Sequence, residues 1–200
     1  MVLILFIRCN LDANPQNYYI FATKLTDFTL SSNCFCMNGI YLIIGGNMGD
    51  RVTLLAECAA FIEKKIGKII QQSALYETAA WGKTDQPSFL NQVLYIHTNQ
   101  SAHDVLKKCL AIEHDMGRIR FQKWESRIID IDILFYNQDV INEKDLSVPH
   151  PQIANRKFVL VPLCEIAPNL IHPVLLLSIE TLLKQCDDPL EVKKMNYTFI

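Results

Sequence analysis

The run Ile-Asp-Ile-Asp-Ile at residues 129–133 constrains the fold of this chain more than any other feature. Together with its neighbours, from 127 to 136, it predicts a β-strand rich in β-branched residues. Successive side chains of a strand point to opposite faces of its sheet. The isoleucines therefore share one face, which can pack into a core, while Asp130 and Asp132 share the other face.

The two aspartates are candidate ligands of a metal ion. Their carboxylates would lie roughly 7 Å apart on a rigid strand, where like charges repel unless a cation lies between them. Hard oxygen ligands that leave positions open for water and phosphate suit Mg²⁺. Taken alone, Asp130 and Asp132 are also compatible with an edge strand whose acidic face is solvated.

Composition limits the class of protein. The chain has 200 residues, of which 50% are hydrophobic and 20% are charged, which is typical of one globular domain with a sizeable core. The formal net charge of −2 argues against a general nucleic-acid binder. No apolar run approaches the length of about 18 residues that a bilayer span requires. We therefore expect neither a nucleic-acid partner nor a membrane partner.

The seven cysteines indicate a reducing compartment. Their number is odd and they form no Cys-x-x-Cys pair, which argues against a disulfide framework or a zinc ribbon. We therefore expect a cytoplasmic protein. The five histidines show no spacing typical of a zinc site, so no zinc site is expected.

Residues 1–36 are expected to be an N-terminal extension that is disordered or results from a misplaced start site. They show no clear helical or strand period after residue 7, whereas Met37 directly precedes a clean strand. The alternative is an additional strand or hairpin. The working domain is expected to span residues 37–200.

Helices and strands are predicted to alternate from Met37 onward. Apolar residues at helical spacing predict helices over 50–66, 102–116, 155–167 and 178–186, and Pro162 should bend or start the third of these. Strands are predicted over 40–45, 68–77, 89–98, 127–136, 140–141 and 194–199. The β-α-β-β-α-β order predicts an α+β fold with a ferredoxin-like core. Helices should pack on a mostly antiparallel sheet in an α/β/α arrangement.

A cluster of cations directly precedes the aspartates. Arg118, Arg120, Lys123 and Arg127 lie within ten residues. Arginine offers a planar fork that matches phosphate oxygens, and a metal ion beside such a cluster favours a polyphosphate ligand. The alternative is a solvated loop whose arginines pair with the aspartates.

A second group of residues favours a flat ligand. The long loop after Thr78 leads into Phe89 and Asn91, which share a strand face and could hold a planar heterocycle by stacking and hydrogen bonds. Trp124 and Phe158 could supply further aromatic faces. The alternative is that these side chains are ordinary core aromatics.

Taken together, the chain resembles the family of 6-hydroxymethyl-7,8-dihydropterin pyrophosphokinases, enzymes of the folate pathway. The resemblance rests on motifs whose order and spacing cover about residues 40–170. These motifs lie at 43–51, 76–78, 85–91, 112–120, Trp124, 127–134, 148–150, 155–156 and 162–168.

The resemblance implies a Mg²⁺-dependent reaction in tetrahydrofolate biosynthesis. ATP, the co-substrate, would donate its β,γ-pyrophosphoryl group to the hydroxymethyl oxygen of 6-hydroxymethyl-7,8-dihydropterin, giving AMP and the pterin diphosphate. Two Mg²⁺ ions would take part, and the enzyme is expected to act as a monomer.

The resemblance also implies roles for individual residues. Asp130 and Asp132 would hold the metal ions and, with Arg118 and Arg127, form the catalytic group. ATP would be bound by Arg120, Arg127, Ile133, His150 and Arg156. The pterin would be bound by Thr78, Ala79, Trp81, Phe89, Asn91, Trp124 and Phe158.

Several positions depart from the family pattern. Glu125 and Ser126 stand where Gly and Pro are usual, and Ala79 and Ala80 stand where prolines are common. Gly46 replaces a usual Ser, and Leu110 replaces a usual Gln. We expect the added charge of Glu125 to weaken ATP binding. Rival interpretations are a catalytically inactive binding module, a ferredoxin-like RNA-binding domain, and a Mg²⁺-dependent transferase with a different acceptor.

Overall fold

The structure is a computed structural model that describes residues 37–79, 86–118 and 126–196. Several residues to which the sequence assigns roles lie outside these ranges. They are the extension 1–36, Trp81, Arg120, Trp124 and Glu125.

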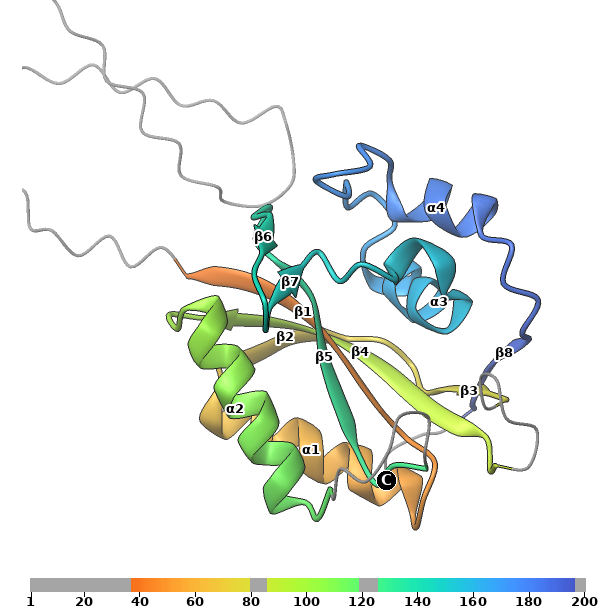
Figure 1. The fold of residues 1–200 in the computed structure, drawn as a ribbon. Coiled ribbons are helices and arrows are strands. Elements are labelled where there is room, and N and C mark those ends of the chain that lie inside the picture. The colour runs from red at the N-terminus through yellow and green to blue at the C-terminus, as the bar shows by residue number, and fades with distance from the viewer. Residues whose placement is uncertain (1–36, 80–85, 119–125, 197–200) are drawn as a thin grey trace, which may run out of the picture. The chain divides into compact units, whose positions relative to one another are not determined.

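A large sheet forms the centre of the fold (Figure 1). All of its pairings are antiparallel, in the order β5-β1-β4-β3-β8, with β2 also paired to β4. Its strands are β1 (Asn38–Gly46), β2 (Lys68–Gln72), β3 (Tyr76–Thr78), β4 (Phe89–Thr98), β5 (Asp130–Tyr136) and β8 (Val192–Lys194). A separate short pair consists of β6 (Ile141–Asn142) and β7 (Ser147–Val148).

Helices cover both faces of the sheet (Figure 1). One face carries α1 (Arg51–Lys65) and α2 (Ala102–Asp115). The other carries the 3-10 helix η1 (Ile153–Asn155), α3 (Lys157–Ile166) and α4 (Ile179–Gln185). The predicted α+β class, the ferredoxin-like order and the α/β/α arrangement are thus confirmed. Within the described ranges, no helix combines the length and apolar character needed to cross a membrane.

Strand alternation divides the core into two layers. Even-numbered residues of β1, such as Leu42 and Ile44, are buried beneath α1 and α2. Ile43 and, on β4, Val93 belong to the core beneath α3 and α4. A β-strand that is buried on both faces usually has a continuous apolar sequence, and β1 has such a sequence, Ile-Tyr-Leu-Ile-Ile.

β5 shows the alternation predicted from its sequence. Ile131 and Ile133 are buried against α1 and α2, and Asp130 and Asp132 lie on the opposite face. A register shift opposite Tyr41 and Leu42 then places two successive residues, Leu134 and Phe135, in the core beneath α3 and α4. The bulge therefore lets the far end of β5 contribute apolar side chains to the face that carries the aspartates.

Some predicted boundaries were wrong. The strand predicted over 68–77 is divided into β2 and β3, because the Val93 amide donates to Ser73 Oγ at 3.0 Å instead of to the Ser73 carbonyl, which ends the regular ladder. β5 begins at Asp130 and not at 127, because the Arg127 amide bonds to the Asn47 side chain instead of a strand neighbour. Pro162 lies inside α3 and does not start it. β7 was not predicted, and β8 begins two residues earlier than expected.

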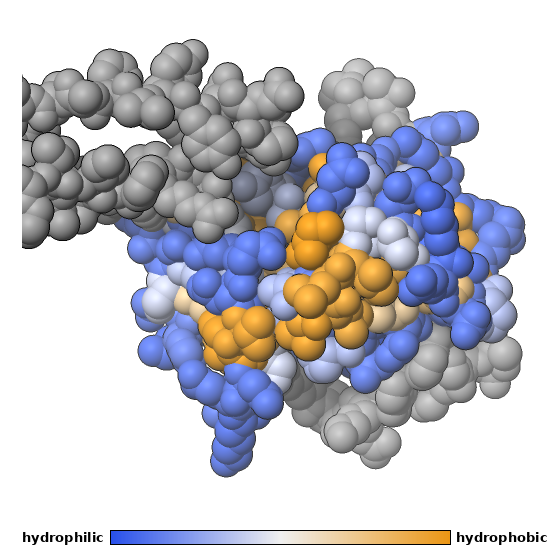
Figure 2. Space-filling model, turned by 90° about the horizontal axis from the view of Figure 1, so that it is seen from above, coloured by the Kyte–Doolittle hydropathy of each residue, from blue (hydrophilic) through white to orange (hydrophobic). Residues whose placement is uncertain are grey.

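The segment before α4 exposes apolar side chains. Figure 2, which views the molecule from the α4 side, shows apolar surface there. The exposed residues are Ile171, Val174, Leu175 and Leu176. Leu176 has a φ of 56°, in the left-handed region that only a turn usually requires. None of these side chains lines the cavity described below.

Two neighbours on α1 allow a test of the packing. Ile62 is fully buried beneath the sheet, whereas Phe61 is 36% exposed. Ile62→Ala should lower the free energy of unfolding by about 2–5 kcal/mol, because it removes buried methylenes and leaves a cavity. Urea denaturation measures this change. Phe61→Ala is the control, with an expected loss below about 1 kcal/mol; equal losses would show that α1 packs with a different face.

Candidate active site

A cavity of about 140 Å³ opens on the face of the sheet that carries α3. Loops, strands and the start of α3 all contribute to its wall. Its lining residues are Ile43, Gly45, Thr78, Ala79, Gln86, Phe89, Asn91, Arg127, Asp130, Asp132, Arg156 and Phe158.

Strand register explains why residues from distant parts of the chain meet here. Gly45 on β1 lies opposite Asn91 on one side and Asp130 on the other. Thr78 on β3 lies opposite Phe89. Directly opposed residues of an antiparallel pair share a face, and so do residues two apart on one strand, such as Phe89 and Asn91. These residues therefore lie on one face of the sheet, in two adjacent rows.

Asp130 is held between two arginines. Arg118 Nη1 lies 2.5 Å from its Oδ1, and Arg127 Nη1 contacts its Oδ2. The sequence left open the alternative that the arginines pair with the aspartates, and such pairs are present at Asp130. Both guanidinium groups remain beside the cavity wall, where an entering anion could also meet them.

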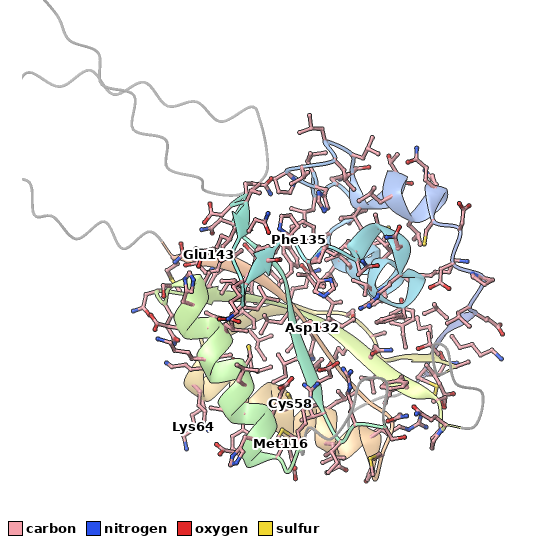
Figure 3. All side chains as sticks on the ribbon, in the orientation of Figure 1. Cys58, Lys64, Met116, Asp132, Phe135 and Glu143 are labelled. Atoms are coloured by element: carbon pink, nitrogen blue, oxygen red, sulfur yellow. The ribbon has the colours of Figure 1, made fainter. Side chains whose placement is uncertain are left out.

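Asp132 is in a different electrostatic position. Burial raises the pKa of its carboxyl to about 6, and the neighbouring charges of Asp130 and Glu113 act in the same direction. Arg156 and Arg127 oppose this shift. Figure 3 labels Asp132 on β5 and Cys58 on α1, the helix that covers the opposite face of the sheet. An ionised Asp132 is thus costly in this site unless a further cation approaches it.

Glu113 is a site residue that the sequence reasoning missed. Its side chain is only 2% exposed, and its Oε1 accepts a hydrogen bond from the Ile131 amide at 2.8 Å. The same oxygen contacts Arg118 Nη1. Glu113 therefore joins the last turn of α2 to the residue between the two aspartates. An acidic residue next to Ile112, within the apolar stripe of the predicted helix, was the available signal.

Asn47 is a second residue whose importance the sequence did not reveal. Its Oδ1 accepts a hydrogen bond from the Arg127 amide at 2.7 Å, and its Nδ2 donates to the Pro87 carbonyl at 3.2 Å. A further contact of 3.4 Å reaches the Ser126 hydroxyl. One buried amide thus holds together three loops at the cavity. The glycine-rich turn around it was interpreted as a weak signal because it fits no phosphate-binding motif.

An amide and a hydroxyl form one edge of the cavity. Asn91 is 5% exposed, and its Nδ2 donates a hydrogen bond to Thr78 Oγ1 at 3.2 Å. A Cβ at Gly45 would lie 2.3 Å from Asn91 Oδ1, so the amide can lie here only because residue 45 has no side chain. Phe89 and Phe158 line the same cavity. This arrangement suits a flat ring with a hydrogen-bonding edge.

His150 and Arg156 are further residues near the aspartates, and the Arg156 guanidinium also lies over the Phe158 ring, with Cζ 5.8 Å from the ring centroid. His150 Nδ1 accepts a hydrogen bond from the Gln152 amide at 3.2 Å. Burial, and then the charge of Arg156, lower the pKa of His150, while Asp130 raises it. A neutral ring whose Nδ1 is an acceptor carries its proton on Nε2, where it can donate to an anion.

The structure separates the predicted site residues into groups. Arg118 contacts Asp130 but is not among the lining residues, and His150 interacts electrostatically with Asp130 and Arg156. Ile133 has its side chain in the core beneath α1 and α2, away from the cavity, so only its backbone could face ATP. The predicted site residues that line the cavity are Thr78, Ala79, Phe89, Asn91, Arg127, Asp130, Asp132, Arg156 and Phe158.

The donor set fits a hard divalent cation. Asp130 and Asp132 present carboxylate oxygens to one cavity, and among the described residues only the first of the two forms an ion pair with arginine. In the part of the chain that the structure describes, no cluster of three or more His, Cys, Asp or Glu side chains could hold a metal by itself. A metal here would need additional oxygens from a ligand and water, as Mg²⁺ usually takes.

Fold and site together define a phosphoryl-type transferase with a planar acceptor. Carboxylates, arginines and a slot for a flat ring share one face of a ferredoxin-like sheet. The model of the 7,8-dihydro-6-hydroxymethylpterin-pyrophosphokinase (HPPK) family matches residues 41–168. The chain belongs to this family.

Individual relatives agree with the family match. The 2-amino-4-hydroxy-6-hydroxymethyldihydropteridine pyrophosphokinase of Methylorubrum extorquens is 41% identical over 136 residues, which is 68% of this chain and 86% of that protein. The protein of the same name from Aquifex aeolicus is 41% identical over 138 residues, which is 69% of this chain and 86% of that one.

Solved structures agree on the fold. Wild-type HPPK-DHPS of Plasmodium falciparum, crystallised with pteroate, superposes with a TM-score of 0.62 at 22% identity. The match covers 74% of this chain and 42% of the Plasmodium chain, so this chain spans less than half of that protein. Similarly, it covers 22% of a folic acid synthesis protein of Pneumocystis carinii, to which it is 33% identical over 162 residues.

Replacement of Asn47 tests the junction of the three loops. Asn47→Ala should lower the free energy of unfolding by about 1–3 kcal/mol, because it leaves the buried Arg127 amide without its acceptor. It should also weaken nucleotide binding, because Arg127 and Asp130 lose their support. Urea denaturation and calorimetric titration with ATP measure the two effects. Asn99→Ala, at an exposed turn, is the control and should change neither; unchanged values for Asn47→Ala would contradict the assigned role.

The pKa of Asp132 leads to a stability prediction. A carboxyl whose pKa is raised on folding contributes stability that is present below pH ~4 and lost as pH rises through the folded value of about 6. Asp132→Asn cannot ionise and should therefore be more stable than wild type by roughly 1–3 kcal/mol at pH 7.5, and by about half of that gain at pH 5.

Urea unfolding with EDTA at both pH values measures this difference. Asp139→Asn, at an exposed turn after β5, is the matched control and should show no such pH dependence. An equal gain for Asp132→Asn at both pH values would show that the cost of ionising Asp132 is small.

Proposed function

We infer that the protein transfers the pyrophosphoryl group of ATP to the hydroxymethyl group of 6-hydroxymethyl-7,8-dihydropterin, giving AMP and the pterin diphosphate in tetrahydrofolate biosynthesis. The family match over residues 41–168 and the relatives at 41% identity support this reaction. The structural observation that carries it is one cavity lined both by the Asp130–Asp132 pair and by the Asn91 amide.

The reaction makes one bond and breaks one. The pterin hydroxyl oxygen attacks the β-phosphorus of ATP, the bond to the α-phosphate breaks, and AMP leaves. Such in-line transfer depends on positioning and charge neutralisation more than on a covalent nucleophile.

Cationic groups at one end of the cavity suit the polyphosphate of ATP. Arg127 and Arg156 line it, and His150 can donate through Nε2. Arg118 approaches from the end of α2 through Asp130. Charge-assisted hydrogen bonds of this kind hold phosphate oxygens and neutralise charge during transfer. A role for Arg120, which lies outside the described residues, stays a prediction from the family resemblance.

Magnesium is the cofactor that the donor set favours. Asp130 and Asp132 would hold two Mg²⁺ ions, with the remaining ligands supplied by phosphate oxygens and water. Bound there, the ions would neutralise phosphate charge and activate the pterin hydroxyl. The high cost of ionising Asp132 without a nearby cation supports this proposal, because a divalent ion would favour the charged carboxylate.

The other end of the cavity suits the pterin ring. The Asn91 amide offers both an acceptor and a donor to a ring edge that has the same combination, and Thr78 Oγ1 fixes the amide's orientation. Phe89 and Phe158 supply the apolar faces. Ala79 lines the entrance. Contacts from Trp81 and Trp124 stay predictions, because both residues lie outside the described ranges.

The finer expectations remain proposals. Residues 37–200 would suffice for catalysis, and the described residues do belong to one compact unit, Phe35–Ile200. A monomer would be sufficient, because every lining residue comes from a single chain. The free thiols Cys58, Cys109, Cys164 and Cys186 are consistent with the proposed cytoplasmic location.

Release of AMP tests the proposed reaction. The protein with ATP and Mg²⁺ should release AMP only when 6-hydroxymethyl-7,8-dihydropterin is present, as measured by chromatography of the nucleotides. Combined Asp130→Ala and Asp132→Ala should lower this rate roughly 10³-fold or more, because transfer loses its charge neutralisation.

Matched controls separate the possible failures. Combined Asp139→Ala and Asp145→Ala removes two exposed aspartates and should leave the rate within about twofold. Formation of ADP would mean that the bond between the β- and γ-phosphates is broken, and not the proposed bond to the α-phosphate. Release of AMP without the pterin would mean that the protein hydrolyses ATP. Deletion of residues 1–36 should leave the pterin-dependent rate of AMP release unchanged. Loss of this activity in the shortened protein would overturn the proposed domain boundary.

A further inference from the structure

The first turn of α3 carries two residues of the cavity wall but has no cap of its own. Arg156, at the N-cap position, makes no side-chain capping hydrogen bond. Arg156 and Phe158 both line the cavity, one on each side of Lys157. Because the first amides of a helix have no partner within it, this turn needs an acceptor from elsewhere.

Asp188 supplies that acceptor from a distant part of the chain. Its Oδ2 accepts a hydrogen bond from the Lys157 amide at 2.9 Å, across a separation of 31 residues. Its Oδ1 accepts from the Leu190 amide at 3.1 Å, and the side chain is only 8% exposed. The negative charge also lies at the end of the helix where the helix dipole favours it.

The segment that carries Asp188 is anchored on both sides. Before it, Ile179 and Leu182 of α4 share a core with Leu160 of α3. After it, β8 pairs with β3, so that Val192 lies opposite Thr78 at the cavity edge. Asp188 therefore caps α3 from a segment whose two ends, α4 and β8, are anchored to α3 and to the cavity edge.

We propose that Asp188 is a positioning residue for pyrophosphoryl transfer, which holds Arg156 toward the nucleotide and Phe158 toward the ring by capping the first turn of α3. This role rests on the proposed function of the cavity. Asp188 lies outside residues 41–168, so the family match does not assign it any role. One carboxylate remote from both substrates would thus hold two neighbouring residues of the cavity wall, Arg156 and Phe158, which are in contact with each other.

Kinetic constants of the full chain distinguish this role from a general contribution to stability. Asp188→Ala should raise KM for ATP and for the pterin, each roughly 3- to 10-fold, because a frayed turn lowers the fraction of molecules that can bind. The value of kcat should stay within about twofold, because bound substrates restore the turn. Asp188→Asn keeps an acceptor oxygen and should recover most of the loss.

Two further variants make the test specific. Asp187→Ala removes the neighbouring, exposed carboxylate and should leave both KM values unchanged. Lys157→Pro removes the capped amide, and proline is favoured at the first position of a helix. Arg156 already has the extended backbone, with φ −129° and ψ 106°, that a residue before proline requires. In the Lys157→Pro background, Asp188→Ala should therefore have little further effect on either KM value.

Amide hydrogen exchange without substrates provides a readout that does not depend on the reaction. Exchange over residues 157–160 should be faster in Asp188→Ala than in wild type, but not in Asp187→Ala. If wild type releases no AMP, the proposed function fails while this measurement still tests the cap. If Asp188→Ala does not fold, KM values and amide exchange are compared with wild type for Asp188→Asn and for variants in the Lys157→Pro background.

Specific results would overturn the proposal. One is faster exchange with both KM values unchanged, which would make Asp188 a structural cap without effect on the site. Another is a rise in KM for only one substrate, which would show that Arg156 and Phe158 are not held together. A fall in kcat that Lys157→Pro does not relieve would place the effect outside α3.

Discussion

The alternation of side chains along β5 is the constraint on which the rest of the structure depends. Burial of Ile131 and Ile133 beneath α1 and α2 forces Asp130 and Asp132 onto the opposite face. Each buried isoleucine contributes about 1.5–3 kcal/mol, and a slip of one residue would expose both of them. Hydrophobic packing on one side of the sheet therefore fixes the position of the charged groups on the other.

The aspartates show how the protein tolerates charge in a partly buried site. Asp130 is balanced by Arg118 and Arg127, whereas Asp132 is left with a pKa raised to about 6. Glu113 adds a third carboxylate behind them and bonds to the Ile131 amide. Ionisation of Asp132 in this partly buried site reduces the stability of the protein when no metal ion is bound. The proposed Mg²⁺ ions would offset this cost, because a nearby cation favours the ionised carboxylate.

The sequence predicted those features that depend on local periodicity. The bounds of β4 and the faces of β5 follow from strand alternation, and the lining residues Phe89 and Asn91 follow from a family motif. Contacts between distant segments were not predictable in this way. Asn47 and Asp188 act through backbone amides far along the chain, and neither a spacing nor a residue type marks such partners. The break at Ser73 depends likewise on a bond to β4.

The close approach of Gly45 to Asn91 has a consequence for inhibition. A Cβ at residue 45 would lie 2.3 Å from Asn91 Oδ1, so any substitution there would displace the amide that is proposed to orient the pterin ring. Consider an inhibitor that packs on Gly45 and hydrogen-bonds to the Asn91 amide. A substitution at Gly45 that weakened binding of this inhibitor would also weaken binding of the proposed pterin substrate. Drug resistance at this end of the cavity would therefore have to arise at the surrounding loops rather than on the floor formed by β1 and β4.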